Sequence, residues 1–326
     1  MTGLVGDIGG TRARFGLVER DGTVGRIADG ECRDHAGLPD ALDAYLEGAG
    51  GGARPRRAAI SVACPVLGDR VSLTNHPWSF SSEEVRRRFG FETLAVINDF
   101  SAVARAVPHL GDADRKQFGG GRPAAKAAIA VLGPGTGLGV SGLVPTDDGW
   151  AVVEGEGGHV TMAATGRREA EVLAEVRREF GHVSAERVLS GPGLVSLHRA
   201  LCRLDGETPG PPPTPHDIVA EGAEGRSSRC AEVLDLASEL LGTFAADLAL
   251  TLGARGGVYI GGGLVPRYAR RFVDSGFRRR FEDKGRFSDY LAAIPTFLIL
   301  HEFPAFLGLA TLVREPTSTR GPAGTG

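Results

Sequence analysis

Apolar positions along the chain recur with two periods, and these predict alternating strands and helices. Short apolar runs predict strands at 3–7, 13–18, 58–63 and 93–97. Helical spacing of apolar residues predicts helices at 38–47, 82–88 and 100–107, with Pro108 ending the last of them. A hairpin followed by alternating helices and strands is typical of an α/β domain, and here we expect the hairpin to open a mixed sheet.

A second unit begins beyond Pro108. The segment AAIAVLGPGTGLGVSGLV, 127–144, repeats the opening plan of apolar strand, Gly/Thr turn and alternating strand. The polar stretch before it, DADRKQFGGGRP at 112–123, is expected to be a linker or surface loop. Apolar residues three and four apart predict a long amphipathic helix over 230–254, and GVYIGGGLVPR at 257–267 predicts a buried strand, a triple-glycine turn and a further helix. Two glycine-rich hairpin turns, one from each unit, are expected to face each other across a cleft.

Composition narrows the class of protein. A length of 326 residues corresponds to about two domains, and a net charge of −3 gives no bulk attraction to nucleic acid or to an anionic membrane. No apolar stretch approaches the roughly 18 residues that a membrane span needs, and no basic leader opens the chain. Scattered cysteines without a zinc-ligand spacing agree with a cytoplasmic protein; they are Cys32, Cys64, Cys202 and Cys230. A Pro-rich loop is expected at 206–215, and a disordered tail at about 315–326.

Three glycine-rich turns, at 9–11, 133–139 and 261–263, follow predicted strands. Consecutive backbone N–H groups in such turns form concavities that bind anions. The first turn, GDIGGT, matches neither the GxxxxGK[ST] loop nor the GxGxxG fingerprint. A chain with 49 glycines produces some glycine-rich turns by chance. Three in this order, two with threonine beside the glycine, favour phosphate binding, which would rely on backbone N–H groups, hydroxyls or arginine because lysine is scarce in this chain.

The stretch LAVINDFSAVARAV ends an apolar strand with Asn98 and Asp99 and then begins a helix. Two interpretations of Asp99 remain open. It is the N-cap of that helix, a position that Asp and Asn favour. Alternatively, it is a carboxylate at the carboxyl end of a strand, aimed into the cleft to orient or deprotonate a hydroxyl nucleophile.

The stretch EGEGGHVTM holds Glu156 and His159, and its two central glycines favour a tight loop over a helix. Metal ligation by this pair is poorly supported, since no third ligand lies nearby in the sequence. Glu186 follows Ser184, where a helix is expected to start, and the helix dipole alone explains a glutamate there. Taken with Asn98 and Asp99, however, these side chains form a set that hydrogen-bonds several hydroxyls. Beside phosphate-binding turns, such a set predicts a sugar kinase.

These motifs together resemble a known family. GDIGGTRARFGLV, LTNHPWSFS, VINDFSAVARAVP, GPGTGLGV, GEGGHV, ERVLSGPGL and GGVYIGGGLVPR occur in the order and approximate spacing of the bacterial ATP-dependent glucokinases of proteobacterial type. The resemblance covers nearly the whole chain. It implies the α/β, two-lobed actin-like ATPase (ribonuclease H-like) fold of the hexokinase superfamily, with a ligand cleft between the lobes. The smaller lobe is expected at 1–108 plus 300–326 and the larger at 109–299. The related ROK kinases and repressors usually carry a zinc-binding cysteine cluster after the sugar-binding histidine, and this chain has none there. A ROK repressor would also need room for a helix-turn-helix before the first motif, so we do not expect this chain to be one.

The resemblance also implies a role for each motif residue. The sugar-binding set is Asn98, Asp99, Glu156, His159, Glu186 and, with less support, Asn75. The nucleotide-binding set is Asp7, Gly9, Gly10, Thr11, Arg12, Gly135, Thr136, Gly137, Gly261, Gly262 and Gly263. Asp99 is implied to be the base for the 6-hydroxyl, Asp7 to lie near Mg²⁺ through water, and the last three glycines to form the adenosine motif. Arg12 departs from the family, which commonly has Asn there; it either helps to hold the γ-phosphate, the interpretation we favour, or points into solvent.

The implied reaction is ATP-dependent phosphorylation of D-glucose to glucose 6-phosphate and ADP, with ATP and Mg²⁺ as cofactors and closure of the two lobes around the sugar. Two alternatives stay open. One is a kinase of the same fold for another hexose, such as mannose, fructose or an N-acetylated sugar. The other is a sugar-binding regulator without catalysis, which intact phosphate turns and Asp99 disfavour. The preferred phosphate donor is open, and so is the oligomeric state, although the family is often homodimeric.

Overall fold

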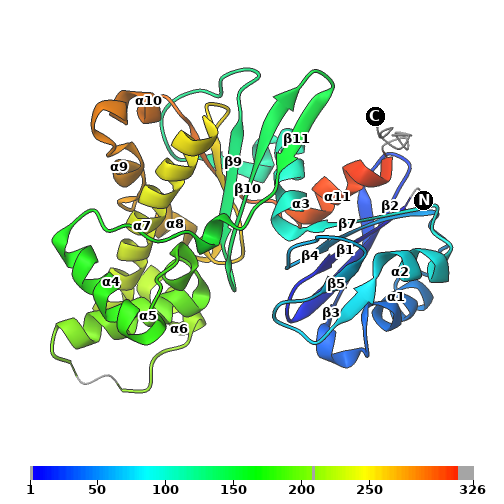
Figure 1. Cartoon of the computed structure of the whole chain (residues 1–326), viewed down its shortest axis with the longest axis horizontal. Coiled ribbons are helices and arrows are strands. Elements are labelled where there is room, and N and C mark those ends of the chain that lie inside the picture. The colour runs from blue at the N-terminus through cyan, green and yellow to red at the C-terminus, as the bar shows by residue number, and fades with distance from the viewer. Residues whose placement is uncertain (1–2, 208–209, 315–326) are drawn as a thin grey trace, which may run out of the picture. The chain divides into compact units, whose positions relative to one another are not determined.

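The computed structural model describes residues 3–207 and 210–314, which divide into two compact units (Figure 1). One unit contains 3–109 together with 302–314, and the other contains 110–301. The expected tail at 315–326 and two positions of the expected Pro-rich loop, 208–209, lie outside the described residues.

The first unit is built on a five-stranded sheet in the order β3–β2–β1–β4–β7. Its strands are β1 (Gly3–Ile8), β2 (Arg12–Val18), β3 (Val24–Glu31), β4 (Arg57–Val62) and β7 (Thr93–Asn98). The β1–β2–β3 meander is antiparallel, whereas β1, β4 and β7 are parallel. The register pairs Ile8 with Val62 and Val62 with Asn98, so the three parallel strands end level with one another. Everything that directly follows these strands therefore lies at one edge of the sheet.

Helices cover both faces of this sheet. Alternation along β1 turns Leu4 and Ile8 into the buried cluster that includes Leu38 and Leu42 of α1 (Leu38–Glu47). The opposite face is covered by α3 (Asp99–Ala106) and α11 (Pro304–Arg314), which lie side by side (Figure 1). A short hairpin of β5 (Arg70–Ser72) and β6 (Ser79–Ser81) leads into α2 (Ser82–Phe89). The segment 302–314 thus completes the first unit although it ends the described chain.

The second unit has a six-stranded sheet in the order β11–β10–β9–β12–β13–β8. Its strands are β8 (Arg115–Gln117), β9 (Ile129–Pro134), β10 (Leu138–Thr146), β11 (Gly149–Val153), β12 (Val258–Ile260) and β13 (Thr296–Ile299). Its helices are α4 (Arg167–Phe180), α5 (Gly191–Leu204), α6 (Pro215–Ala223), α7 (Ser228–Leu252), α8 (Ala269–Val273), α9 (Phe277–Glu282) and α10 (Ser288–Ala292). The long helix α7 packs against β9, α5, α6 and α9 and forms the centre of the core.

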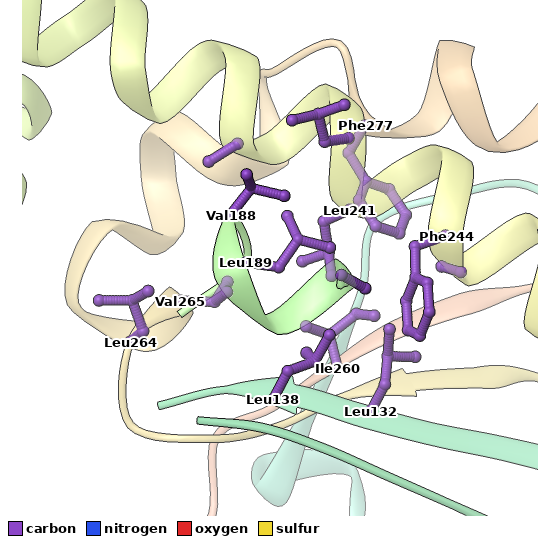
Figure 2. Close-up of a cluster of buried hydrophobic side chains, with 14 of the residues drawn as sticks. Leu132, Leu138, Val188, Leu189, Leu241, Phe244, Ile260, Leu264, Val265 and Phe277 are labelled. Carbon is purple, nitrogen blue, oxygen red and sulfur yellow. The ribbon is translucent and has the colours of Figure 1, made fainter. Parts of the chain in front are cut away.

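One apolar cluster in this core lies directly beneath the ends of β9 and β12. Leu132 and Ile260 come from the two strands, and Phe244 reaches them from α7 (Figure 2). Leu138 and Val188 belong to the same cluster. Since all five side chains are buried, the backbone segments that carry them are fixed relative to one another.

Most expected elements are confirmed, including both hairpins, α1, α2, α3 and α7. The expectation of a linker or surface loop throughout 112–123 is wrong, because β8 lies within it and pairs antiparallel with β13. That strand has the polar sequence Arg-Lys-Gln and lies at the edge of the sheet. An edge strand has a neighbouring strand on one side only, so polar and charged side chains are common in it. None of the helices in the described part of the chain combines the length and apolar character needed to cross a membrane.

Candidate active site

The first glycine-rich turn joins β1 to β2. The Gly9 N–H donates to the Arg12 carbonyl at 2.9 Å, and the Cys32 N–H donates to the Thr11 carbonyl at 2.8 Å, which ties the turn to the end of β3. A Cβ on Gly9 would meet only the Arg12 carbonyl, at an ordinary 3.6 Å. A Cβ on Gly10 would lie 3.0 Å from the Cβ of Asn75, so Asn75 lies beside this turn. Packing within the protein therefore does not require a glycine at position 9, and a close approach by a ligand is the better explanation for the missing side chain.

Asp7 lies on β1 between two polar neighbours. In the register, Arg14 of β2 is opposite on one side and Ser61 of β4 on the other. The Ser61 hydroxyl donates to Asp7 Oδ1 at 2.7 Å, and Arg14 Nη1 lies 3.6 Å from Asp7 Oδ2. Burial raises the pKa of Asp7 above its ordinary value, although the Ser61 hydrogen bond and the Arg14 charge lower it. A quarter of the side chain stays exposed, so the carboxylate is within reach of a ligand.

Arg12 and Arg14 both bind Asp29 of β3. Arg12 Nε donates to Asp29 Oδ1 at 2.7 Å, and Arg14 Nε donates to Asp29 Oδ2 at 3.2 Å. Burial opposes ionisation of Asp29, but these hydrogen bonds and charges outweigh it and hold its pKa below the ordinary value. Asp7, Arg14, Asp29 and Arg12 thus form a ladder of alternating charge across one face of the sheet. Arg12 lies on the exposed end of this ladder, with 48% of its side chain accessible.

The N-cap of α3 is Asn98, which overturns the interpretation of Asp99 as the cap. Asn98 Oδ1 accepts hydrogen bonds from the N–H groups of Phe100 at 2.9 Å and Ser101 at 3.2 Å. Because the amide oxygen is engaged by the helix, the amide nitrogen is the end of Asn98 that can donate to a ligand. Asp99 is the first helical residue, and its Oδ1 accepts from the Phe100 N–H at 2.8 Å. Negative charge is favourable there because of the helix dipole.

The third turn, 261–263, is in backbone contact with the end of β9, directly before residues 135–137 of the second turn. The Gly261 N–H donates to the Leu132 carbonyl at 2.8 Å, and the Leu264 N–H donates to the Pro134 carbonyl at 3.1 Å. A Cβ on Gly262, which has a φ of +80°, would lie 2.4 Å from the Pro134 carbonyl oxygen, so only glycine fits there. A Cβ on Gly263 would meet nothing within 4 Å, which leaves that face of the turn open to a ligand.

Glu156 and His159 flank a single 3₁₀ turn, η4 (Gly157–His159), close to the expected tight loop. A Cβ on Gly158 would lie 2.2 Å from the Leu138 carbonyl oxygen, so this glycine allows the loop to lie on β10. Glu156 Oε2 and His159 Nε2 are 4.0 Å apart, and both side chains are more than half exposed. Among the described residues, no group of three or more His, Cys, Asp and Glu side chains is placed to hold a metal ion.

Glu186 lies in η5 (Ala185–Arg187), which starts directly after Ser184 as expected but is a single 3₁₀ turn and not an α-helix. The helix α5 begins only at Gly191, with the Ser190 side chain as its cap. A single 3₁₀ turn has only a small dipole, so the helix dipole alone does not explain the glutamate. Instead, Glu186 Oε2 accepts a hydrogen bond from the Leu138 N–H at 2.9 Å, directly after the second turn.

The expected site residues thus form two groups, one in each unit. The first unit holds Asp7, Gly9, Gly10, Thr11, Arg12, Asn75, Asn98 and Asp99. The second holds Gly135, Thr136, Gly137, Glu156, His159, Glu186, Gly261, Gly262 and Gly263. Sequence reasoning missed Ser61 and Arg14. A lone serine in the apolar run of β4 was the available signal for Ser61, and the position opposite Asp7 in the hairpin was the signal for Arg14.

The donor set around Asp7 suits Mg²⁺. The Asp7 carboxylate and the Ser61 hydroxyl supply hard oxygen atoms, the ligand type that this cation takes. In phosphate-transfer sites Mg²⁺ is usually held by one or two carboxylates together with the substrate's phosphates, so a single protein carboxylate is sufficient.

Comparison with known proteins defines the class and then the family. A crystal structure of glucokinase from an Antarctic psychrotroph matches with a TM-score of 0.85 and 37% identity, covering 95% of this chain and 98% of that one. A ROK family glucokinase from Streptomyces griseus, solved in complex with glucose and AMPPNP, matches with a TM-score of 0.67 and 19% identity, covering 96% and 99%. The fold is therefore that of the actin-like ATPase sugar kinases.

The sequence comparisons are more specific. The family described as Glucokinase matches residues 4–316. A relative named Glucokinase from Aromatoleum aromaticum is 53% identical over 309 residues, covering 94% of this chain and 93% of the relative. The chain belongs to the glucokinase family, which confirms the family predicted from the motifs.

We predict that Asp7→Asn raises the stability of the folded protein at pH 8. A carboxylate whose pKa is raised by folding binds its proton more tightly in the folded state. Stability is therefore lost as the pH rises from the ordinary value of 3.8 through the folded-state pKa, and the loss is complete above it. Asparagine does not titrate and therefore escapes this loss.

Melting temperatures of both proteins from pH 4 to pH 8 test this. The advantage of the variant should be present at pH 8 and disappear as the pH approaches 4. A native protein that is the more stable of the two at pH 8, with the difference vanishing at pH 4, would contradict the direction of the Asp7 pKa shift.

Proposed function

We propose that this protein transfers the γ-phosphoryl group of ATP to the 6-hydroxyl of D-glucose. The observation that carries the proposal is the common register of β1, β4 and β7, which brings Asp99 and the first phosphate turn to the same edge of one sheet. Two strand spacings separate β1 from β7, about 10 Å. A catalytic carboxylate and a phosphate cradle are thereby held on one rigid element.

The proposed sugar contacts are chemically matched to hydroxyl groups. Asn98 presents its amide nitrogen as a donor, because its oxygen caps α3. Carboxylates can accept hydrogen bonds from two or more hydroxyls, and an imidazole can donate or accept. Glu156, His159 and Glu186 are part-buried or exposed and lie on joined loops, since the Ala185 N–H donates to the Val160 carbonyl at 2.9 Å. In this proposal Asn75 contributes from beside the first turn.

The proposed phosphate contacts are backbone N–H groups and hydroxyls of the 9–11 and 135–137 turns. Thr11 and Thr136 are both exposed. Mg²⁺ held near Asp7 would supply positive charge to the phosphate oxygens when bound with ATP. Arg12 adds a fixed cation, because Asp29 takes its Nε–H and a guanidinium carries four further N–H donors.

The adenosine end of the proposed nucleotide site lies beyond the 261–263 turn. A cavity of about 550 Å³ is lined by His216, Val219 and Ala220 of α6 and by Arg267. Arg267 lies in η6 (Val265–Tyr268), which directly follows the triple-glycine motif and packs against α6. A nucleoside is a group of suitable size for a cavity of this volume.

Asp99 acts as the proton acceptor in the proposed mechanism. The 6-hydroxyl oxygen forms a bond to the γ-phosphorus while the bond from that phosphorus to the β–γ bridging oxygen breaks, and ADP leaves with the electron pair. The hydroxyl proton passes to an Asp99 oxygen. Because an ordinary aspartate is a weak base for an alcohol, this transfer is late, as the new ester bond forms. The site therefore works mainly by positioning and charge neutralisation.

We further propose that the protein works in the cytoplasm. All four cysteines are buried and none forms a disulfide, a state typical of proteins in a reducing compartment.

We predict that Asp99→Asn lowers kcat by about 10²- to 10⁴-fold, the range expected for loss of a general base. The measurement is glucose-dependent release of ADP from Mg·ATP. The matched control is Asp40→Asn, which removes an acidic residue from the first turn of α1 in the same unit. The control should keep kcat within about twofold of the native value, because α1 covers the opposite face of the sheet.

Melting temperatures separate catalysis from helix stability. If Asp99→Asn lowers the melting temperature but leaves kcat nearly unchanged, Asp99 acts structurally and the proposed mechanism is wrong. If the native protein phosphorylates another hexose faster than glucose, the proposed mechanism stands but the assigned substrate is wrong.

We predict that Arg12→Asn, which introduces the residue common in the family, raises KM for Mg·ATP about three- to tenfold. Loss of one charge-assisted contact at an exposed position is expected to cost this much. KM for glucose and kcat should stay within twofold. Arg88→Asn, at an exposed arginine of α2 that pairs with Asp43, is the control. An unchanged KM for Mg·ATP would show that Arg12 serves only its pair with Asp29.

A further inference from the structure

We propose that Glu186 joins the sugar site to the second phosphate turn, so that glucose and nucleotide strengthen each other's binding through this one carboxylate. The inference rests on the proposed function, because it takes Glu186 as a sugar contact. It adds a second role for the same side chain, as a support of the phosphate turn.

The contact between Glu186 and the turn is direct. Glu186 Oε2 accepts the Leu138 N–H at 2.9 Å, and Leu138 is the first residue after Gly137. A Cβ on Gly137 would lie 2.5 Å from the same oxygen, so any larger residue there would displace the carboxylate. Gly137 therefore serves this contact in addition to any approach by phosphate.

The backbone around Glu186 is also fixed to the turn. The Gly191 N–H donates to the Gly135 carbonyl at 2.8 Å, and the Ser190 hydroxyl donates to the Glu186 carbonyl at 2.7 Å. Beneath these contacts, Leu138, Val188 and Leu189 belong to one buried cluster (Figure 2). With its backbone held in this way, Glu186 can change its contact with Leu138 only by moving its side chain.

A carboxylate can serve both ligands at once. Its two oxygens offer about four acceptor sites, of which the Leu138 N–H uses one. A sugar hydroxyl that donates to the remaining sites would fix the Glu186 rotamer in which the carboxylate accepts the Leu138 N–H. The same rotamer would then serve both ligands, and the entropy cost of immobilising this side chain is met only once. Linkage requires the same factor in the reverse direction, so nucleotide must raise the affinity for glucose equally.

The test is calorimetric titration of D-glucose into the full chain, with and without saturating Mg·AMPPNP. The ratio of the two Kd values is the coupling factor. For the native protein we expect about fivefold to tenfold tighter glucose binding with nucleotide. Gly137→Ala should weaken glucose binding about tenfold even without nucleotide and bring the coupling factor close to one.

Gly135→Ala is the matched control, since its Cβ would come no closer than 3.9 Å to any group, the Gly263 nitrogen. It should change the affinity for Mg·AMPPNP but leave the glucose Kd without nucleotide at the native value. Native-like glucose binding and coupling in Gly137→Ala would overturn the inference.

Two substitutions of Glu186 keep the inference falsifiable if Gly137→Ala does not fold. Glu186→Gln retains an oxygen that accepts the Leu138 N–H, so coupling should persist at reduced glucose affinity. Glu186→Ala should lose both. If Glu186→Ala binds glucose more weakly but has the same coupling factor as the native protein, the inference is overturned while the proposed sugar site stands. A native-like glucose Kd in Glu186→Ala would instead show that Glu186 is not a sugar contact, and the sugar site itself would be wrongly assigned.

Discussion

The parallel register of β1, β4 and β7 is the constraint on which the chemistry of the first unit depends. It aligns Ile8, Val62 and Asn98, so that the 9–11 turn and Asp99 emerge at the same level. It also places Ser61 beside Asp7, where its hydroxyl holds one carboxylate oxygen. A slip of one residue would turn Asp7 to the face covered by α1 and bring Ile8 into its place. Fold stability and site geometry are therefore determined by the same hydrogen bonds.

In the second unit, close backbone contacts at glycines fix the positions of the candidate site loops. Gly262 lies so close to the Pro134 carbonyl that the second and third turns form one surface. Gly158 lets the loop that carries Glu156 and His159 rest on the Leu138 carbonyl. These glycines cost conformational entropy on folding, and they place functional groups where side chains would keep them apart. The buried cluster beneath them, which includes Leu132, Leu138 and Ile260, supplies the rigid base.

Sequence alone predicted the elements with strong apolar periods. Both hairpins and α7 followed from spacing, because alternate or helical burial leaves a clear pattern. Polar edge strands such as β8 left no such pattern. At the site, sequence located Asn98 and Asp99 but could not assign the cap, since either residue type fills that position and only hydrogen-bond geometry separates them.

Glu186 shows a further limit of the sequence. Its partner, the Leu138 N–H, is a backbone group 48 residues away, and every residue except proline has such a donor. No residue type in the sequence therefore marks the contact. Arg14 differs from Glu186, because a signal for it was present in the sequence although it was missed. Its position opposite Asp7 follows from the hairpin that the sequence predicted.

The most direct test of the account is the position of the new phosphate bond in the product. The purified chain would be incubated with Mg·ATP and ¹³C-labelled D-glucose, and carbon–phosphorus coupling would be recorded by NMR. The account predicts coupling at C6, through two bonds, and at its neighbour C5, through three bonds, with one ADP formed per glucose consumed. Coupling at another carbon, or ADP formation without a phosphorylated sugar, would contradict it.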